Sequence, residues 1–421
     1  MRLKNTFAKL SGVASGLLLS GLLALNGVEA RLVSDDNGTS VDVPEHISRI
    51  VVTNILPLAS AVTMYLGDGS RIVGMHPASM SAAKSGLLGE LHPEVLQADT
   101  HFIQGANLNL ESLMALKPDL VLVNASDRRM LDRVRAAGLT AFGISAVKWH
   151  YDVEATYEGW MRSLKALFPD AKANSAAMAE KFRHYRTLIA ERTSNLSDAQ
   201  RRTVLFIVRT DARQLVVSGE KFFGEYWAKA VGAKNAAHEL KAENANAVVT
   251  MESIYAWNPD IVLLTNFTPL QPNDLIEGRD AGRDWTSVKA VKDRRVYKMP
   301  LGLYRSFTPT ADTPLTLLWL AKTIYPERFA DIDLQAETEH FYRDVFGLSL
   351  TEAQIKTIYA PQARASVGLT GSVRSSRRSD NLGCKPCTNP LLTRSLRPIP
   401  PILLLRIGAV PRSNSSASLR L

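Results

Sequence analysis

Residues that could perform chemistry are thinly spread in this chain. Gly219 and Gly224 have the spacing of a phosphate-binding loop, but an acid and a tyrosine follow Gly224 where that loop needs lysine and a hydroxyl residue. Cys384 and Cys387 form a single CxxC without a second pair or a histidine cluster for zinc. The sequence has no motif for a nucleophile with its base and no dinucleotide fingerprint. We therefore expect no catalytic residue, no cofactor and no resident metal.

One of the eight histidines has a suggestive position. His76 ends the apolar run 71–76, and loops at the carboxyl ends of strands build the sites of open α/β sheets. A lone histidine there is more often hydrogen-bonded or exposed than a ligand. His76 is therefore a candidate binding residue rather than a predicted metal centre.

A repeated segment reveals the elements that must position such residues. Residues 111–123 read ESLMALKPDLVLV, and residues 252–264 read ESIYAWNPDIVLL, in the same register without a gap. Each copy reads as a short helix, a proline stop and a buried strand. A separation of 141 positions (252 minus 111) is too long for a solenoid period and indicates two related domains.

The surrounding pattern predicts an α/β fold of two Rossmann-like lobes, each with a parallel sheet. Continuously apolar strands alternate with helices, as in sheets that are covered on both faces. A helix over about 170–195, capped by Asp170, carries an apolar stripe and should connect the lobes. The expected division is a signal peptide, an N-terminal lobe, connecting helices, a C-terminal lobe and a disordered, possibly non-native tail, at 1–30, 45–150, 151–196, 201–350 and 367–421.

The basic surplus lies at the two ends of the chain. The formal net charge is +9, but residues 31–366 hold 38 basic and 39 acidic residues, so the core gives no support for nucleic-acid binding. A charged start, an apolar run and the tripeptide ending at Ala30 predict an export signal that is cleaved near that residue. The lobes contain no cysteine, which large cores tolerate. We expect an exported, periplasmic protein.

The twin segments resemble the signatures of the class III periplasmic substrate-binding proteins of ABC importers, which serve ferric siderophores, vitamin B12 and haem. The resemblance covers about 45–350 and includes the phrase WTSVKAVKDRRVYKMP near the end of the second lobe. It implies two α/β lobes joined by a rigid helix, a ligand held between them and no enzymatic activity. It also implies an ABC permease dimer of the inner membrane as partner of a monomeric binding protein.

Loops at the carboxyl ends of the strands should line the cleft between the lobes. Arginines beside aromatic rings would suit an anionic metal chelate, because guanidinium groups pair with carboxylate or catecholate oxygens. The family often places an aromatic–basic element where Tyr304 and Arg305 stand. The candidate ligand-binding residues are Asn54, His76, Gln104, Asn124, Arg209, Lys221, Phe222, Tyr226, Asn266, Tyr304 and Arg305.

Glu111 and Glu252 occupy equivalent positions in the first turn of the repeated helix, after Asn109 and Thr250 at the N-cap positions. The helix dipole alone favours a carboxylate there. In the resembled family the equivalent glutamates meet arginines of the permease. Two matched acids, one per lobe, suit a partner with twofold symmetry.

The sequence leaves the ligand open. A ferric siderophore is the leading expectation, with the protein delivering this small iron(III) chelate to its permease. Vitamin B12 ranks lower because Asn124 stands where the cobalamin binder has a tryptophan, and haem also follows the siderophore. Direct capture of zinc or manganese would need several converging ligands, of which only His76 is well placed. An enzyme on a two-lobed scaffold is the remaining alternative.

Overall fold

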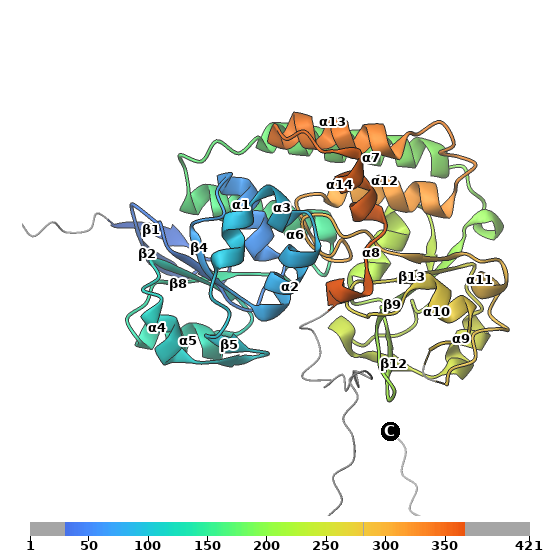
Figure 1. Ribbon diagram of the computed structural model, residues 1–421, viewed down its shortest axis with the longest axis horizontal. Helices are drawn as coiled ribbons and strands as arrows, with labels where there is room; N and C mark the ends of the chain where they lie inside the picture. Colours follow the sequence, from blue (N-terminus) through green and yellow to red (C-terminus); the bar gives the residue numbers. More distant parts are fainter. Residues whose placement is uncertain (1–29, 281, 367–421) are drawn as a thin grey trace, which may run out of the picture. The chain divides into compact units, whose positions relative to one another are not determined.

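The structure is a computed structural model that describes residues 30–280 and 282–366 (Figure 1). These residues belong to one compact unit of the chain. Most of the expected signal peptide, the expected tail at 367–421 and both cysteines lie outside the described residues.

The first lobe is built on a four-stranded parallel sheet in the order β4-β3-β7-β8. Alternate residues of its strands enter two different apolar cores: Val52 and Leu122 face one, whereas Val51 and Val121 face the other. Both faces of the sheet are therefore covered, which explains the continuously apolar strands. The strands are β3 (Ile50–Val52), β4 (Ile72–Met75), β7 (Leu120–Asn124) and β8 (Ala141–Ile144).

Helices and two small hairpins complete this lobe. Residues 103–108 form one of these hairpins, which is separate from the parallel sheet. The helices are α1 (Leu58–Leu66), α2 (Pro77–Ser85), α3 (Leu88–Leu91), η1 (Pro93–Gln97), α4 (Leu110–Ala115) and α5 (Arg128–Ala136). The hairpins are β1 (Ala30–Ser34) with β2 (Ser40–Pro44), and β5 (Ile103–Gln104) with β6 (Asn107–Leu108).

Two helices, α6 (Val153–Leu167) and α7 (Ser175–Thr193), connect the lobes. The expected long helix begins five residues later than Asp170, because Asn174 caps it by accepting a hydrogen bond from the Ala177 amide at 3.1 Å. Its stripe of Met178, Phe182, Tyr185 and Ile189 is buried. This stripe faces two later helices, and α7 lies beside α13 (Leu334–Phe346) in Figure 1. The connector is thus packed into the fold along its length.

The second lobe contains a six-stranded mixed sheet with the path β12-β10-β9-β13-β14, and β11 pairs with β9. Strand β10 is antiparallel to β9, which differs from the expected all-parallel sheet. Residues 211–214 form a tight turn in which the Asp211 carboxylate accepts two backbone amides, and so short a connection can only return the chain antiparallel. The strands are β9 (Thr203–Thr210), β10 (Leu215–Val217), β11 (Lys234–Asn235), β12 (Ala247–Val249), β13 (Ile261–Leu264) and β14 (Val296–Lys298).

The helices of the second lobe include the second copy of the repeated unit. Its helix, α9, precedes β13 as α4 precedes β7, so the repeat marks the same helix–strand step in both lobes. The helical elements are η2 (Asp198–Gln200), α8 (Phe223–Ala230), η3 (Asn244–Asn246), α9 (Met251–Trp257), α10 (Pro272–Ile276), α11 (Lys289–Lys292), α12 (Thr313–Ile324), α13, α14 (Glu352–Tyr359) and η4 (Ala363–Ser366).

Candidate ligand-binding site

Arg305 of the second lobe reaches the first lobe. Its side chain is fully buried, and Nη1 donates to the Ala78 carbonyl of α2 at 2.9 Å and to the Tyr304 hydroxyl at 2.9 Å. Nε donates to the Asn266 carbonyl at 3.1 Å, and the rings of Phe267 and Tyr304 lie 5.5 and 5.2 Å from the guanidinium carbon. One guanidinium therefore joins both lobes at the carboxyl ends of β13 and β14. This point is the centre of the candidate site.

The loop that carries Arg305 is a buried segment, residues 299–312, between β14 and α12. The Asp312 carboxylate holds it by accepting the Leu303 amide at 3.0 Å and the Tyr342 hydroxyl at 3.1 Å. A Cβ at Gly302 would lie 1.7 Å from Asp312 Oδ2, so this approach requires glycine. Burial raises the pKa of Asp312, although these hydrogen bonds oppose the effect. These hydrogen bonds are made within the second lobe and hold the loop that presents Arg305.

His76 fixes the start of α2 opposite Arg305. Pro77 occupies the first helical position, where its fixed φ suits a helix, and His76 is the N-cap. His76 Nδ1 accepts from the Ala78 amide at 3.0 Å, and Nε2 lies 3.2 Å from the Gly105 carbonyl. Burial lowers the pKa of His76, and the nearby Arg305 charge lowers it further. A neutral imidazole with both nitrogens engaged positions α2 and leaves no lone pair for a metal.

A second basic side chain, Lys298, lies close enough to Arg305 for their charges to interact. Lys298 ends β14 in the core, and its Nζ donates to the carbonyls of Thr268 and Leu270 at 2.7 Å each. Burial lowers the pKa of Lys298 to about 7, with Asp274 opposing and Arg305 reinforcing the shift. Asn266 donates from Nδ2 to two carbonyls, whereas its buried Oδ1 has no hydrogen-bond partner in the described part of the chain. The carboxyl-end side of β14 thus holds two basic side chains, of which only Arg305 is charged at every pH near neutrality.

We expect Lys298 to make stability depend on pH above neutrality. The unfolded lysine has a pKa near 10.4, so between about pH 7 and 10 the unfolded chain binds more protons than the folded chain. The free energy of unfolding should therefore rise with pH, by about 1 kcal/mol per pH unit from this group. Urea unfolding at pH 7, 8 and 9 should show this slope in the native protein and lose it in Lys298→Met.

Lys292→Met removes an exposed lysine of α11 and serves as the matched control. It should retain the native slope. Equal slopes in the native protein and Lys298→Met would show that Lys298 keeps an ordinary pKa in the fold.

Four other candidate residues occupy strand ends as expected, at varying distance from the lobe junction. Asn54 and Asn124 follow β3 and end β7, and Asn54 Oδ1 accepts from the Asn124 amide at 3.0 Å. Asn54 Nδ2 donates to Asp127 Oδ2 at 3.0 Å, so this pair is part of a local network. Gln104 is exposed on β5, and Arg209 is half-buried near the end of β9.

Among the described residues, the segment Lys221–Tyr226 is linked to the loop of Arg305 through the ring of Phe222 and not by a contact with Arg305 itself. Lys221 is exposed, and its Nζ lies 3.6 Å from Oε1 of Glu243. Phe222 packs edge-on against Tyr151 and Phe307, with centroids 5.6 and 5.3 Å apart. Phe222 therefore belongs to an aromatic cluster that buries apolar ring area beside this loop.

Tyr226 turns toward the connecting helices. It lines a groove of about 1080 Å³ together with residues of α6 and α7, among them Glu154 and Arg186. Burial raises the pKa of Tyr226, and the Glu154 carboxylate raises it further. A second cavity of about 720 Å³ lies among α1, α6, α7 and α13. Neither lining includes Arg305.

Sequence reasoning missed two contributors to the site. Lys298 was not among the candidate residues, although a lysine inside the run VYKMP was a usable signal. Helix α2 was not expected, although a histidine before proline and a run of small residues matches a helix start. Without α2, the Ala78 carbonyl could not be placed beside Arg305.

The two matched glutamates are exposed on their helices. Glu111 lies in the first turn of α4, where Asn109 Oδ1 caps the helix by accepting the Ser112 amide at 3.0 Å. Glu252 lies in the first turn of α9, and a hydrogen bond from the Thr250 side chain lowers its pKa. Thr250 is the N-cap of α9 but makes no side-chain cap bond to the backbone.

Two α/β lobes, joined by packed helices and meeting at a buried cationic group, define a two-lobed solute-binding protein. The chain belongs to the periplasmic binding protein family, whose model matches residues 62–301. This is a family of solute-binding transport proteins rather than enzymes. No described helix is long and apolar enough to cross a membrane.

Individual relatives give the range of the family. The chain is 25% identical over 362 residues to the molybdate-binding protein MolA of Haemophilus influenzae, covering 81% of this chain and 97% of that protein. It is 23% identical over 218 residues to the Fe(3+)-citrate-binding protein YfmC of Bacillus subtilis, covering 52% and 64%. A crystal structure of a periplasmic solute binding protein from Veillonella parvula matches with a TM-score of 0.68 and 27% identity, covering 79% and 97%.

Proposed function

We propose that this protein captures an anionic solute between its lobes and delivers it to an ABC-type permease. The observation that carries the proposal is Arg305, a buried guanidinium that bridges the second lobe and the start of α2. A guanidinium binds the oxygens of oxyanions and carboxylates with two parallel hydrogen bonds. Lys298 is a second basic group close enough to interact with the Arg305 charge, and burial lowers its pKa to about 7.

A compact metal oxyanion is the first candidate ligand. The polar groups around Arg305 are closely packed and buried, which suits a small anion with several oxygens. Phe222 packs in an aromatic cluster with Phe307, and Tyr226 lines a groove beside α6 and α7, so neither is counted here among the groups that would contact this anion. The relative MolA, which is described as molybdate-binding, supports the same class.

An iron(III) chelate is the second candidate, and a ferric siderophore was the expectation from the sequence. Phe267 and Tyr304 could contact the organic part of such a ligand beside Arg305. The relative YfmC, described as Fe(3+)-citrate-binding, supports a carboxylate chelate. Both candidates are anions and would use the same guanidinium.

The experiment is a binding panel followed by thermal unfolding and calorimetry. The ligands are molybdate, tungstate, sulfate, ferric citrate, a ferric catecholate, a ferric hydroxamate, haem, cobalamin and Zn²⁺. A ligand at 100 times its Kd should raise the free energy of unfolding by about 2.7 kcal/mol. We expect stabilisation by molybdate and tungstate, or by ferric citrate if the second candidate is right. Binding of Zn²⁺ or cobalamin alone would refute the anion proposal.

We also infer that the protein acts as a monomer in the periplasm after cleavage near Ala30. The Arg31 guanidinium donates to the carbonyls of Ala166 and Leu167 at the end of α6, where the helix dipole favours a cation. A mature chain that begins at Arg31 would keep this contact. Amino-terminal sequencing of the exported protein tests the site of cleavage.

A further inference from the structure

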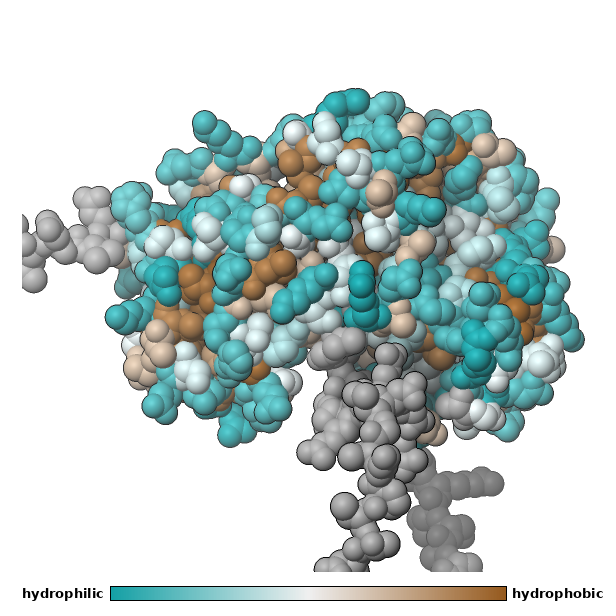
Figure 2. All heavy atoms as spheres, in the orientation of Figure 1, coloured by the Kyte–Doolittle hydropathy of each residue, from teal (hydrophilic) through white to brown (hydrophobic). Residues whose placement is uncertain are grey.

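Large apolar side chains are rarely exposed on this protein, and two of them occupy matched positions. In the described ranges, exposed large hydrophobic residues are Leu32, Met114, Val248 and Tyr255. Met114 is 48% exposed on α4 and Tyr255 is 40% exposed on α9. Figure 2 shows a face on which hydrophilic residues surround several apolar patches, and a single exposed apolar side chain is ordinary. The matched placement of Met114 and Tyr255 is the unusual feature.

Each of these residues stands three positions after a matched glutamate. Met114 follows Glu111, and Tyr255 follows Glu252, so each pair lies on one face of its helix, one turn apart. The residue just before each apolar side chain, Leu113 or Ile254, is fully buried. Leu113 and Ile254 occupy equivalent positions, and each packs its helix onto the core of its lobe. On the outer side, each helix exposes a carboxylate beside an apolar side chain.

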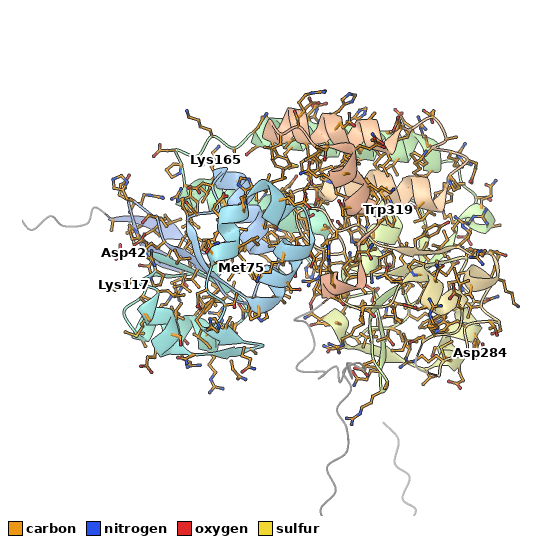
Figure 3. All side chains as sticks on the ribbon, in the orientation of Figure 1. Asp42, Met75, Lys117, Lys165, Asp284 and Trp319 are labelled. Atoms are coloured by element: carbon orange, nitrogen blue, oxygen red, sulfur yellow. The ribbon has the colours of Figure 1, made fainter. Side chains whose placement is uncertain are left out.

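The surface position of Tyr255 is fixed by a hydrogen bond. Its hydroxyl donates to the Asp284 carbonyl at 2.7 Å, and Figure 3 labels Asp284 at the margin of the second lobe. A tyrosine held in this way presents its ring with little loss of side-chain freedom on binding. Met114 has a flexible, polarisable side chain that adapts to a partner surface. In Figure 1, α4 and α9 both lie toward the lower side of their lobes.

We propose that Met114 and Tyr255 are apolar anchors that seat the two lobes on the two halves of a membrane permease dimer. The proposal rests on the proposed function, because it adds to the docking of Glu111 and Glu252. A partner with twofold symmetry offers the same surface twice, which matches one acid–apolar pair per lobe. Exposed ion pairs are weak and screened by salt, whereas buried apolar and aromatic groups retain their contribution.

The partner surface should therefore place a cationic residue beside an apolar depression in each subunit. The glutamates would steer the encounter and set orientation, and the anchors would lengthen the lifetime of the complex. Removing the anchors should mainly raise the dissociation rate. Removing the glutamates should mainly lower the association rate at low salt.

The test uses the whole protein and the cognate ABC permease in lipid nanodiscs, with Kd measured at 50 and 500 mM NaCl. The anchor variant is Met114→Gln with Tyr255→Gln, and Tyr255→Phe is a second variant that keeps the ring. Leu32→Gln with Val248→Gln is the control, since it removes the other two exposed hydrophobic residues. We expect the anchor variant to bind about tenfold or more weakly at both salt concentrations, with Tyr255→Phe and the control close to native.

Solute binding by the anchor variant, measured in the same preparation, should be native and shows that the lobes are folded. Native permease affinity in the anchor variant, with loss only in the Glu111→Arg and Glu252→Arg protein, overturns the anchor proposal and leaves the docking glutamates standing. Native affinity in both proteins overturns the anchors and the proposed docking face together. A loss as large in the control as in the anchor variant also overturns the anchor proposal.

Discussion

Arg305→Gln is expected to weaken solute binding by about 100-fold or more. The substitution removes the charge and the planar pair of donors that an anion would contact, and loss of a buried charged partner costs about 2–5 kcal/mol. Calorimetry with the ligand identified by the panel measures the effect. Arg305→Lys keeps the charge without the two-pronged geometry and should fall between the native protein and Arg305→Gln.

Arg295→Gln is the matched control for this prediction. Arg295 stands just before the first residue of β14, whereas Arg305 follows the last. Like Arg305, it donates to backbone carbonyls, those of Thr323 and Ile324. Its loss should change stability but leave solute affinity within about threefold of native. Urea unfolding of every variant separates misfolding from loss of the site. Native affinity in a folded Arg305→Gln protein would remove Arg305 from the binding site.

Reversing both exposed glutamates, Glu111→Arg together with Glu252→Arg, is expected to abolish uptake while solute affinity stays native. Both carboxylates are exposed and lie outside the lobe junction, so the solute site should be unaffected. Like charges facing across an interface cost several kcal/mol, which would reduce productive docking by about 100-fold or more. Uptake of labelled solute by cells that depend on this protein measures the effect.

The single reversals should each retain part of the uptake, because one matched contact would remain. Glu180→Arg with Glu191→Arg, which reverses two exposed acids on α7, is the control and should transport normally. Parallel loss of solute affinity in the Glu111 and Glu252 variant would place these residues in the ligand site instead. Normal uptake in that variant would move docking to another face.

The sequence predicted the fold through features that depend on neighbouring residues. The repeat 111–123 and 252–264 placed α4 with β7 and α9 with β13, because a short helix, a proline and a buried strand each follow from local pattern. The stripe on α7 was correct for the same reason, since its 3–4 spacing identifies a buried face. The start of that helix was wrong, because Asn174 competes with Asp170 as a cap and only packing selects between them.

The candidate site was less accessible, because contacts between distant residues define it. Tyr304 and Arg305 were named as candidates, but the contact of Arg305 with Ala78 spans 227 positions and no local pattern reports it. The surroundings of Phe222 and Tyr226 also depend on distant residues, because Phe222 packs against Tyr151 and Phe307 whereas Tyr226 lines a groove beside α6 and α7. Lys298 is buried because other segments cover the end of β14. The sequence of the strand alone does not indicate which segments these are.

The bond between Arg305 and Ala78 makes the protein its own competitor for the guanidinium. An arriving anion competes with the Ala78 carbonyl for Nη1 of Arg305, so the self-bonded form should bind it less well than a form in which Nη1 is released. If the self-bonded form outnumbers the released form by about 100 to 1, the apparent Kd rises by up to about 100-fold above the intrinsic value. Affinity could then evolve through the start of α2, a segment with no ligand contact of its own, by changing how often the arginine is available.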